Sequence, residues 1–352
     1  MKEKNLKQLK KLHIVVDINH PAHVHFFRNF IKIAQKKGHK VLITASRKEM
    51  TQVLLKKYRL PFVNMGSYGD KAWQKVFMIP VMDYRMWRAA KNFKPDLFLG
   101  IASIRGPHAA KFLGAKAINF DDTGYPMTVK LYYPFVDAVF TPQCFKPIFG
   151  KKQIRYNGFH ELAYVHPRYY KPKNINRELG LKKTDPYFIV RFVGWGAGHD
   201  IGQGGFTTAE KVKLVKLLEG FGKVFITSEK GVPVELKKNI LKNSPEKIFD
   251  LMAHARMVIS EGATVASEAA LIGVPTVSVN SIYCDTLAEQ QKLGILRYFL
   301  DGKRALAYIK KAVKDKELIQ KNRVAQKKAL KKLEDITELL LSILAKSLES
   351  KK

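Results

Sequence analysis

The sequence predicts an α/β protein built from two domains with parallel sheets, and three observations carry this prediction. The chain has 352 residues, more than a single hydrophobic core usually organises. Hydrophobic residues make up 46% of it, which is enough for two cores. Short β-branched runs alternate with segments of helical periodicity, and this rhythm restarts at Tyr187 after a loop-rich crossing near Gly158. Such alternation is typical of parallel sheets covered by helices.

The first half is expected to repeat strand, connecting loop and helix. Residues 12–18 read as a buried strand, and the loop 19–25 leaves its carboxyl end. A helix over 26–37 should end at Gly38, because glycine is the usual residue after a helix. The other strands of this half are expected at 40–44, near 63, at 97–100, at 117–120 and at 136–141, the last one, with a mostly helical insert at 66–93.

The second half is expected to open with a strand at 187–193 and a glycine-rich loop at 194–205. Successive glycine N–H groups can form a concavity that holds an anion; the alternative is a surface loop. The loop is not a dinucleotide-binding fingerprint, because the next helix starts only near Thr208. The later elements are expected as a helix at 208–219, a strand at 223–227, a helix at 245–255 and one or two lysine-rich helices after 305.

Residues 257–280 are the most informative stretch, because they spell strand, tight loop, helix and strand. Thr264 is expected to cap this helix and Gly273 to end it. A helix N-terminus after a small-residue loop favours a diphosphate, because its first N–H groups are unpaired. Glu268, one turn further, can accept hydrogen bonds from the two hydroxyls of a ribose. Alternatively, the small residues only allow a turn and Glu268 is a solvated helix residue.

Histidines and paired carboxylates follow two predicted strands, at the edge where open α/β sheets collect ligands. His20, His23 and His25 lack helical i, i+4 spacing and an acidic or cysteine partner, so no metal site is expected. Acid–base chemistry suits them better, because imidazole titrates near neutral pH; the alternative is that they cap the next helix. Asp121 and Asp122 can hold a hydroxyl, act as a base or cap a helix.

The formal charge of +33 favours nucleic acid, an anionic membrane surface or phosphorylated substrates as partners. The lysines are dispersed and no aromatic residues interleave with them, so a lysine-rich proteome explains the charge better than nucleic-acid binding does. A non-enzymatic polyanion-binding protein is the competing class.

No apolar run reaches the roughly 18 residues of a spanning helix, and the N-terminus lacks a signal-peptide core, which predicts a cytoplasmic protein. Cys144 and Cys284 lack metal spacing and are expected to be reduced.

Several motifs spread over residues 12 to 300 resemble one prokaryotic family, known as domain of unknown function 354. They are VDINHPAHVHFFRNF, KPDLFLGIAS, RYNGFHELAYVHP, RFVGWGAGHD and SEGATVASEAALIGVPT. The last of them is also similar to the nucleotide-sugar loop of GT-B glycosyltransferases, such as the peptidoglycan N-acetylglucosaminyl transferase, and of the UDP-N-acetylglucosamine 2-epimerases. This resemblance implies the GT-B architecture: two Rossmann-like, doubly wound domains facing a cleft, with C-terminal helices crossing back.

The resemblance also implies a role for each site residue. The diphosphate would rest on Ser260, Gly262, Ala263 and Thr264, and the ribose on Glu268. The loop after the first strand would supply the general base, with His23 as the first choice and His20 as the second. Asp121 is a further catalytic candidate from its position at a strand end. The remaining donor-site candidates are Arg191, His199, His160 and Glu161.

The implied substrate is a nucleotide-diphosphate sugar, most simply a UDP-sugar, with no bound cofactor and no metal. The acceptor would be a glycan, a lipid-linked molecule or a small molecule, and an apolar stripe flanked by Arg85 and Arg88 would allow peripheral contact with an anionic membrane. An epimerase is the alternative enzyme, although Asn19-His20-Pro21 stands where its arginine-proline loop would be expected. The predicted segments are a basic leader at 1–11, a first domain at 12–157, a linker at 158–172, a second domain at 173–304 and terminal helices at 305–352.

Overall fold

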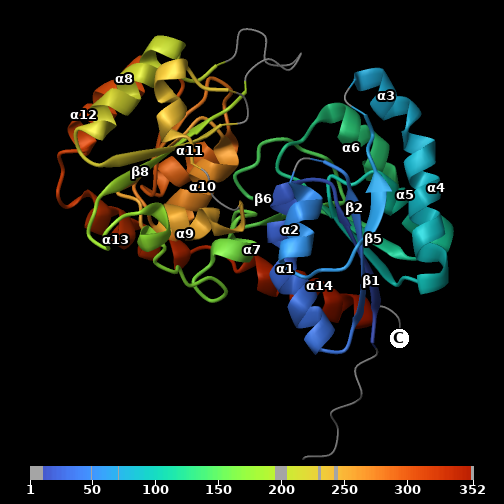
Figure 1. Cartoon of the computed structure of the whole chain (residues 1–352). Coiled ribbons are helices and arrows are strands. Elements are labelled where there is room, and N and C mark those ends of the chain that lie inside the picture. Colours follow the sequence, from blue (N-terminus) through green and yellow to red (C-terminus); the bar gives the residue numbers. More distant parts are fainter. Residues whose placement is uncertain are drawn as a thin grey trace, which may run out of the picture. The chain divides into compact units, whose positions relative to one another are not determined.

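A computed structural model describes residues 11–48, 50–69, 71–194, 204–228, 231–241 and 245–349 (Figure 1). The chain divides into two compact units. The first comprises Met1–Tyr164 together with Glu334–Lys352, and the second comprises Val165–Leu333. The first crossing therefore falls inside the linker predicted at 158–172, whereas the second falls within the predicted terminal helices.

Parallel strands form the sheet of the first unit, in the order β3-β2-β1-β4-β5-β6-β7. Their bounds are β1 His13–Ile18, β2 Lys40–Ser46, β3 Val63–Gly66, β4 Leu97–Ile101, β5 Lys116–Phe120, β6 Ala138–Pro142 and β7 Gln153–Tyr156. The strand predicted at 136–141 is confirmed as β6, but it is not the last of this half, because β7 pairs with it.

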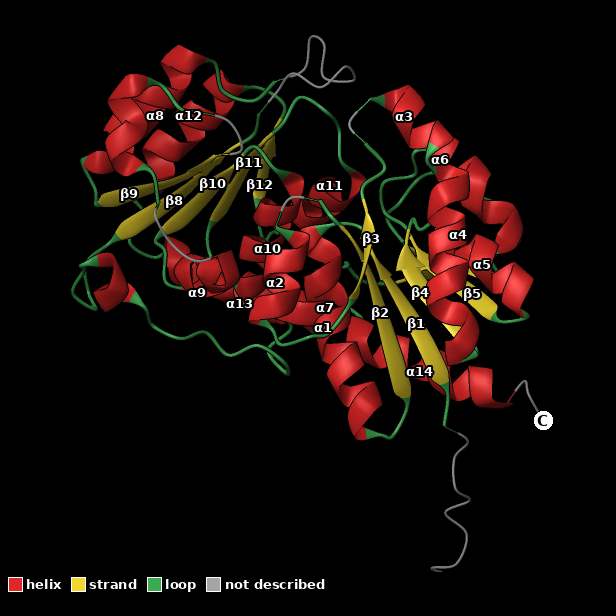
Figure 2. Ribbon diagram, turned by 45° about the vertical axis from the view of Figure 1, so that its right-hand side comes forward, coloured by secondary structure: helices red, strands yellow, loops and turns green. Residues whose placement is uncertain are grey.

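Helices cover both faces of this sheet, which explains why its inner strands are mostly apolar on both sides. Helices α4, α5 and α6 lie on one face, and α1, α2 and α14 lie on the other (Figure 2). The helix bounds are α1 Pro21–Lys36, α2 Thr51–Lys57, α3 Ala72–Phe77, α4 Ile79–Ala90, α5 Arg105–Leu113, α6 Pro126–Tyr132, α7 Leu162–Val165 and α14 Ile336–Glu349. All five residues of β4 are buried between the two helical layers.

Helix α1 begins five residues earlier than predicted, so His23 and His25 lie in its first turns and not in a loop. Pro21 occupies its first position, where the fixed φ of proline suits a helix start and its missing N–H costs nothing. His20 is the N-cap, and its Nδ1 accepts a hydrogen bond from the backbone N–H of Ala22. The capping role that the sequence left open is therefore correct for His20.

The second unit has its own parallel sheet, in the order β12-β11-β10-β8-β9. The strands are β8 Tyr187–Phe192, β9 Lys223–Ser228, β10 Met257–Ser260, β11 Thr276–Val279 and β12 Arg297–Phe299. The α-helices are α8 Thr208–Glu219, α9 Ile248–Ala253, α10 Ala263–Ile272, α11 Asp285–Lys292, α12 Gly302–Ala312 and α13 Leu318–Leu330. Helices α8 and α12 cover one face, and α9, α10 and α13 cover the other (Figure 2).

Local signals explain several helix ends in the second unit. Helix α8 starts as predicted, with a reciprocal capping box between Thr207 and Glu210. Gly273 ends α10 with a φ of 96°, which is a left-handed conformation that favours glycine. Thr264 is not the cap of α10, because the helix begins one residue before it and Gly262 is the N-cap. Throughout the described ranges, no helix combines the length and the apolar character needed to cross a membrane.

The last helix returns to the first unit. Thr337 donates its hydroxyl to the carbonyl of Ala163 at 2.9 Å, and the backbone N–H of Asn157 donates to Glu334 at 2.8 Å. The apolar residues Ile336 and Leu340 of α14 are fully buried. Of the terminal helices predicted after 305, α12 and α13 thus belong to the second unit, and α14 alone crosses back.

Each sheet has one switch point, a pair of adjacent strands from which the chain adds its following strands toward opposite sides of the sheet. It lies between β1 and β4 in the first unit and between β8 and β10 in the second. Ligands of open α/β sheets bind outside the carboxyl ends of the strands at such a switch point. The segment after β1 and the turn before α10, both chosen from the sequence, lie at these two positions.

Candidate functional site

The N-terminus of α10 is the candidate anion site of the second unit. Thr264 is exposed and Ala263 is half-buried, and the N-cap residue, Gly262, has no side chain that could cap the first turn. Uncapped N–H groups at a helix start carry a partial positive charge that favours an anion. Ser260, by contrast, is fully buried, and its hydroxyl bonds to the N–H and the carbonyl of Gly262 at 3.0 and 2.7 Å. Ser260 therefore shapes the turn, and its predicted contact with a diphosphate is not favoured.

Two glycines near this turn differ in what an added side chain would meet. A Cβ on Gly205 would lie 2.5 Å from Glu261 Oε1, so packing excludes a side chain there. A Cβ on Gly262 would meet only ordinary contacts, at 3.5 Å from Val193 and 3.7 Å from Ser260. Its φ of −88° is also open to any residue. Neither a positive φ nor packing requires a glycine at 262, and its place as the N-cap of α10 is one that glycine often occupies.

Glu268 lies one turn inside α10 and is only 5% exposed. The alternative that it is a solvated helix residue is therefore wrong. A buried carboxylate is costly unless it has a partner or a function. Its place behind the open helix end is compatible with the ribose contact that the resemblance implies.

Glu261 is a buried residue of this edge that the sequence interpretation overlooked. Its carboxylate accepts hydrogen bonds from the N–H groups of Val193 and Phe206, both at 2.8 Å, and lies 3.3 Å from Lys211 Nζ. It thereby holds the residues on either side of the glycine-rich loop predicted at 194–205. Arg191, at the end of β8, accepts the N–H of Glu261 with its carbonyl at 3.0 Å, and predicted His199 lies outside the described residues.

In the first unit, His20 and His23 are held in the same way. Each Nδ1 accepts a backbone N–H, from Ala22 at 3.2 Å and from Asn19 at 3.3 Å. Because a backbone N–H can only donate, the neutral imidazoles carry their proton on Nε2. Burial, helped by the nearby charges of His20 and His160, holds the pKa of His23 well below its usual value. This geometry favours His23 as a hydrogen-bond donor over the general base predicted for it.

The adjacent carboxylates Asp121 and Asp122 have different surroundings. Asp121 is fully buried and accepts hydrogen bonds from the N–H groups of Thr123 and Gly124, both at 2.9 Å, and from the Tyr132 hydroxyl at 2.7 Å. It is a structural turn residue, and its predicted catalytic role is not favoured. The side chain of Asp122 is 27% exposed. The accessible carboxylate at this strand end is therefore Asp122.

Asp122 pairs with His160, whose Nδ1 lies 3.2 Å from Asp122 Oδ2. Burial alone would raise the pKa of Asp122, but the charge and hydrogen bond of His160 outweigh it and lower that pKa. Burial likewise opposes protonation of His160, but Asp122 raises its pKa. The pair is thus a carboxylate and an imidazole that favour each other's charged forms, and both act electrostatically on His23. Glu161, the next residue, is 8% exposed and belongs to the first unit.

A charged network that was not predicted from the sequence lies at the carboxyl end of β1. Arg105 is fully buried and forms a 2.6 Å ion pair with Asp17 near the end of β1. The available signal was a charged residue within an otherwise apolar strand, VVDI, together with an arginine after β4. Within the described ranges, no group of three histidine, cysteine or acidic side chains is arranged to hold a metal ion.

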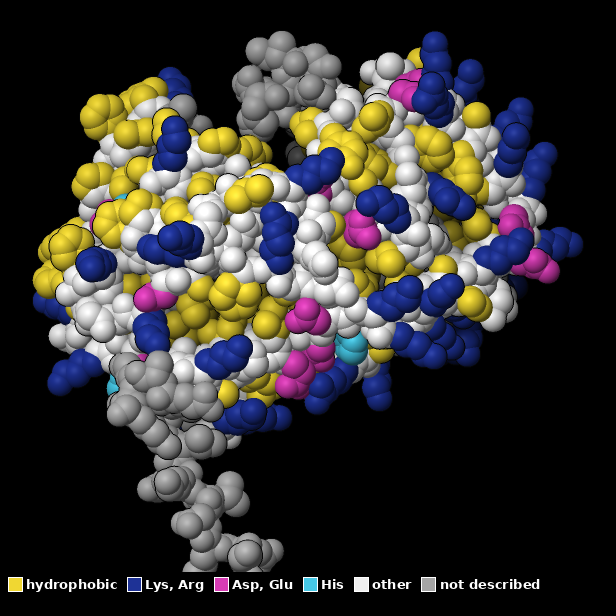
Figure 3. Space-filling model, turned by 180° about the vertical axis from the view of Figure 1, so that it is seen from behind, with side chains coloured by type: hydrophobic (Ala, Val, Ile, Leu, Met, Phe, Trp, Pro, Cys, Tyr) yellow, Lys and Arg dark blue, Asp and Glu magenta, His cyan; other side chains and the backbone are white. Residues whose placement is uncertain are grey.

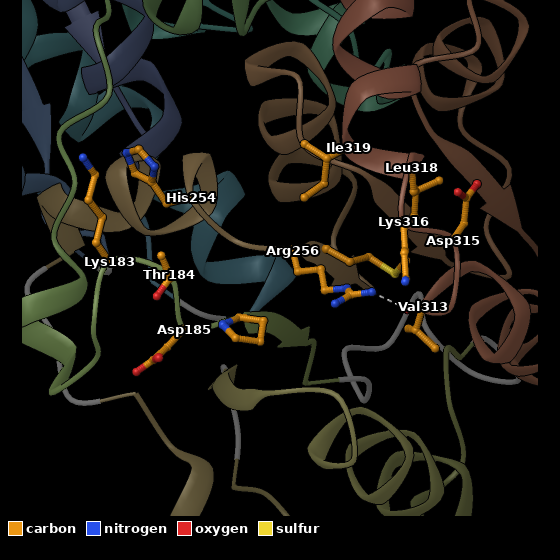
Figure 4. Close-up of a pocket in the computed structure, with 12 residues that line it drawn as sticks. Lys183, Thr184, Asp185, His254, Arg256, Val313, Asp315, Lys316, Leu318 and Ile319 are labelled. Carbon is orange, nitrogen blue, oxygen red and sulfur yellow. Dashed lines mark hydrogen bonds between the residues drawn. The ribbon is translucent and has the colours of Figure 1, made fainter.

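A cavity of about 320 Å³ in the second unit lies at the opposite, amino-terminal ends of β8 and β10 (Figure 4). Arg256 lies in it and donates to the carbonyl of Val313 at 2.7 Å, directly after α12. A guanidinium at a helix C-terminus is a stabilising arrangement. Arg256 thus spans the cavity and caps the end of α12. The cavity also lies at the edge of the sheet opposite to the one where α/β proteins bind ligands, so it is not the candidate site.

Cationic side chains are scattered over the surface seen in Figure 3 and are interrupted by polar and apolar groups. Part of the predicted apolar stripe is core, because Met82 and Met86 are fully buried. Trp73 and Phe77 are 58% and 74% exposed. Arg85, predicted to flank this stripe, has a structural contact as well, because it donates a hydrogen bond to the carbonyl of Met65 at 2.9 Å.

Comparison with known proteins places this geometry in a family and a fold. A family model described as a protein of unknown function (DUF354) matches residues 12–349. An uncharacterised protein of Methanocaldococcus jannaschii is 23% identical over 313 residues, which cover 84% of this chain and 87% of that protein.

Solved structures of two enzyme types share the fold. The UDP-GlcNAc 2-epimerase from Neisseria meningitidis bound to UDP-GlcNAc matches with a TM-score of 0.66 at 12% identity, covering 96% of this chain and all of that one (100%). A glycosyltransferase of Streptomyces sp. SF2575, complexed with thymidine diphosphate, matches with a TM-score of 0.62 at 16% identity, covering 95% and 99%. At these identities the likeness shows the fold alone, and it confirms the predicted GT-B type with two Rossmann-like domains. Because the family model spans nearly the whole chain, the protein belongs to the DUF354 family.

Proposed function

We propose that the protein is a nucleotide-sugar-dependent enzyme that binds the diphosphate of its substrate at the N-terminus of α10. The observation that carries this proposal is the exposed, uncapped start of α10 at the switch point of the second sheet. The presence of a glycine at 262 that neither backbone nor packing requires supports it. A diphosphate fits this place because two or more N–H groups and the helix dipole act on it together.

The leading reaction is transfer of the sugar to an acceptor hydroxyl, without a metal ion. The groups of the first unit suit this chemistry in a division of roles that differs from the prediction. Asp122, anionic and partly exposed, accepts the proton of the attacking hydroxyl, and His160 orients it. His23 donates a hydrogen bond from Nε2 to a substrate oxygen.

Isothermal titration of UDP tests the nucleotide site. Glu268→Gln keeps the side-chain shape and removes the charge that would hold the ribose, so affinity should fall about tenfold or more. Glu219→Gln is the matched control, because Glu219 ends α8 at the other edge of the sheet; its affinity should stay at the wild-type value. Equal losses in both variants, or no binding of UDP, dTDP, ADP or GDP by the native chain, would contradict the proposal.

Epimerisation of the nucleotide sugar is the second candidate, and the shared fold with the Neisseria enzyme favours it. Incubation of UDP-GlcNAc with the protein, with and without candidate acceptors, separates the two reactions. A product epimerised at the sugar without acceptor supports the second candidate. Consumption that depends on a glycan or lipid-linked acceptor supports transfer. Sequence-independent DNA binding unaffected by Glu268→Gln would instead favour a polyanion-binding protein.

The acceptor side includes a proposed contact with an anionic membrane surface. Exposed Trp73 and Phe77 at α3 provide apolar groups, and the net charge of +33 provides attraction. Sedimentation with vesicles containing anionic lipid should retain the wild type and lose the Trp73→Ser, Phe77→Ser double variant. Equal retention of both proteins would show that net charge alone is responsible.

A further inference from the structure

The buried ion pair of the first unit uses every hydrogen-bonding group of its carboxylate. Asp17 Oδ1 accepts from Arg105 Nη2 at 2.6 Å, from Arg105 Nε at 3.0 Å and from Thr44 Oγ1 at 2.8 Å. Its Oδ2 accepts from Ser103 Oγ at 2.6 Å and from Asn19 Nδ2 at 3.0 Å. Both charged side chains are at most 1% exposed. Burial of such a pair is tolerable only when its polar groups are satisfied in this way, and stability alone seldom accounts for it.

The network extends from the ion pair to a single amide side chain. Arg105 Nη2 also donates to Asn19 Oδ1 at 2.8 Å, and Arg105 Nη1 donates to Ser46 Oγ at 3.0 Å. Ser46 in turn donates to Asn19 Oδ1 at 2.8 Å. The Asn19 amide is therefore held at both ends, by Arg105 and Ser46 on its oxygen and by Asp17 on its nitrogen.

Asn19 passes this fixation on to His23 through its backbone. Its N–H donates to His23 Nδ1 at 3.3 Å, which places the imidazole proton on Nε2. That Nε2 has no partner among the described residues, and His23 is half-buried at the start of α1. The ring also lies beside His20, with ring centroids 5.8 Å apart. Nδ1 thus fixes the orientation of the ring, and the Nε2–H remains available to donate. Recognition of a substrate oxygen requires such an oriented donor.

We propose that Arg105 and Asn19 are positioning residues that act through His23, holding its imidazole as an Nε2–H donor toward a substrate oxygen. This inference rests on the proposed function for the identity of that oxygen, which belongs to the acceptor or the departing phosphate. The guanidinium fork is essential to it, because Arg105 reaches Asp17, Asn19 and Ser46 at once. A lysine at 105 can pair with Asp17 but cannot span all three groups.

Long-range ¹H–¹⁵N NMR of the histidine-labelled full chain tests the proposal, since it distinguishes protonated from unprotonated ring nitrogens. The signal absent from His23→Gln identifies His23. In the wild type, it should show one species protonated at Nε2. In Arg105→Lys and in Asn19→Ala, the backbone N–H of residue 19 remains but is no longer held in place, so its hydrogen bond to His23 Nδ1 weakens. The His23 signal should then become a mixture of tautomers, and the proton affinity of His23 should rise about tenfold, because that hydrogen bond favours the neutral ring. The charged and titratable groups acting on this ring are His20, His160, Asp122 and Lys48.

Thr44→Val is the matched control. It removes one hydrogen bond to Asp17, keeps the side-chain shape and leaves the Asn19 amide in place, so the His23 signals should match those of the wild type. Asn19→Ala and Thr44→Val both retain the ion pair and are the variants that decide if Arg105→Lys fails to fold. A wild-type proton on Nδ1, or the same His23 signals in Asn19→Ala as in the wild type, would overturn the proposal. The readout needs no nucleotide, so a failure of UDP binding overturns the proposed function separately.

Discussion

The two switch points of this protein lie at equivalent edges of similar sheets, yet they are built from different materials. In the first unit, the edge is lined by side chains: the ion pair of Asp17 and Arg105, the imidazole of His23 and the carboxylate of Asp122. In the second unit, it is a turn of small residues that leaves the backbone N–H groups of α10 uncapped. Backbone groups suit the binding of a diphosphate, and titratable side chains suit proton transfer.

The proposed function thus assigns diphosphate binding to the second unit and proton transfer to the first. Buried carboxylates occur at both edges, but they act on different partners. Asp17 fixes other side chains, whereas Glu261 holds the backbone of Val193 and Phe206. The two units should therefore respond differently to substitution, to acid and to added methyl groups.

The largest expected effect is the loss of the arginine in the first unit. Arg105→Met leaves Asp17 as a buried charge without its counterion, which typically costs about 3–5 kcal/mol of unfolding free energy. Urea unfolding followed by circular dichroism measures it. Thr44→Val should cost only about 1 kcal/mol, because it removes a single hydrogen bond. A similar small loss in both variants would show that the ion pair is not important for the fold.

The second unit should lose less when its buried carboxylate is removed. Glu261→Ala deprives the N–H groups of Val193 and Phe206 of their acceptor, and we expect a loss of about 2–3 kcal/mol. The same urea titration measures it. Glu210→Ala, which removes an exposed capping box from α8, is a control with an expected loss of about 1 kcal/mol. A smaller loss for Glu261→Ala than for this control would contradict the proposed role of Glu261 in holding the backbone of Val193 and Phe206.

Acid should weaken the first unit through His25. Burial, with the charges of Arg28 and His20, lowers the pKa of His25 to about 3. Between pH 6.5 and 3 the unfolded chain binds a proton that the folded chain does not, so this contribution is complete above pH 6.5 and is lost as pH falls. At pH 5 the loss is about 2 kcal/mol. The stability difference between pH 7 and pH 5 should therefore be smaller in His25→Phe by this amount; equal differences would contradict it.

The smallest expected effect separates two glycines within the second unit. Gly262→Ala meets no close contact and should cost no more than about 1 kcal/mol, the usual penalty for alanine at an N-cap, while weakening UDP binding. Gly205→Ala forces a methyl group into Glu261 and should cost about 1–3 kcal/mol. Thermal melting and UDP titration of both variants provide the comparison. If Gly262→Ala is the more destabilised variant, the glycine serves the fold and not the ligand.

The sequence predicted most of what depends on local patterns. The strands β1, β8 and β10, the helix α8 and the left-handed end of α10 all follow from periodicity and capping residues that are close together in the chain. The turn before α10 was found for the same reason, because backbone recognition leaves a compact signature of small residues.

Long-range partnerships escaped prediction. Asp17 and Arg105 are 88 positions apart, so nothing near either residue announces the other. The choice between Asp121 and Asp122 depends on two residues further along the chain: Tyr132 bonds to Asp121, and His160 pairs with Asp122. The early start of α1 had a local signal, because Pro21 follows a residue that can cap a helix. The three histidines within six residues led to the interpretation of this segment as a loop. The hydrogen bond from the Asn19 N–H to His23 Nδ1, by contrast, is local, and it favours His23 as a donor over the predicted base.

Hydrogen–deuterium exchange with and without UDP tests the central claim most directly, because it reports on the backbone N–H groups that are proposed to bind the diphosphate. Saturating UDP should slow exchange in peptides covering Gly262 to Val265 by at least about tenfold, with little change in peptides from α5. UDP binding without protection at the start of α10, or protection confined to another part of the chain, would contradict the account.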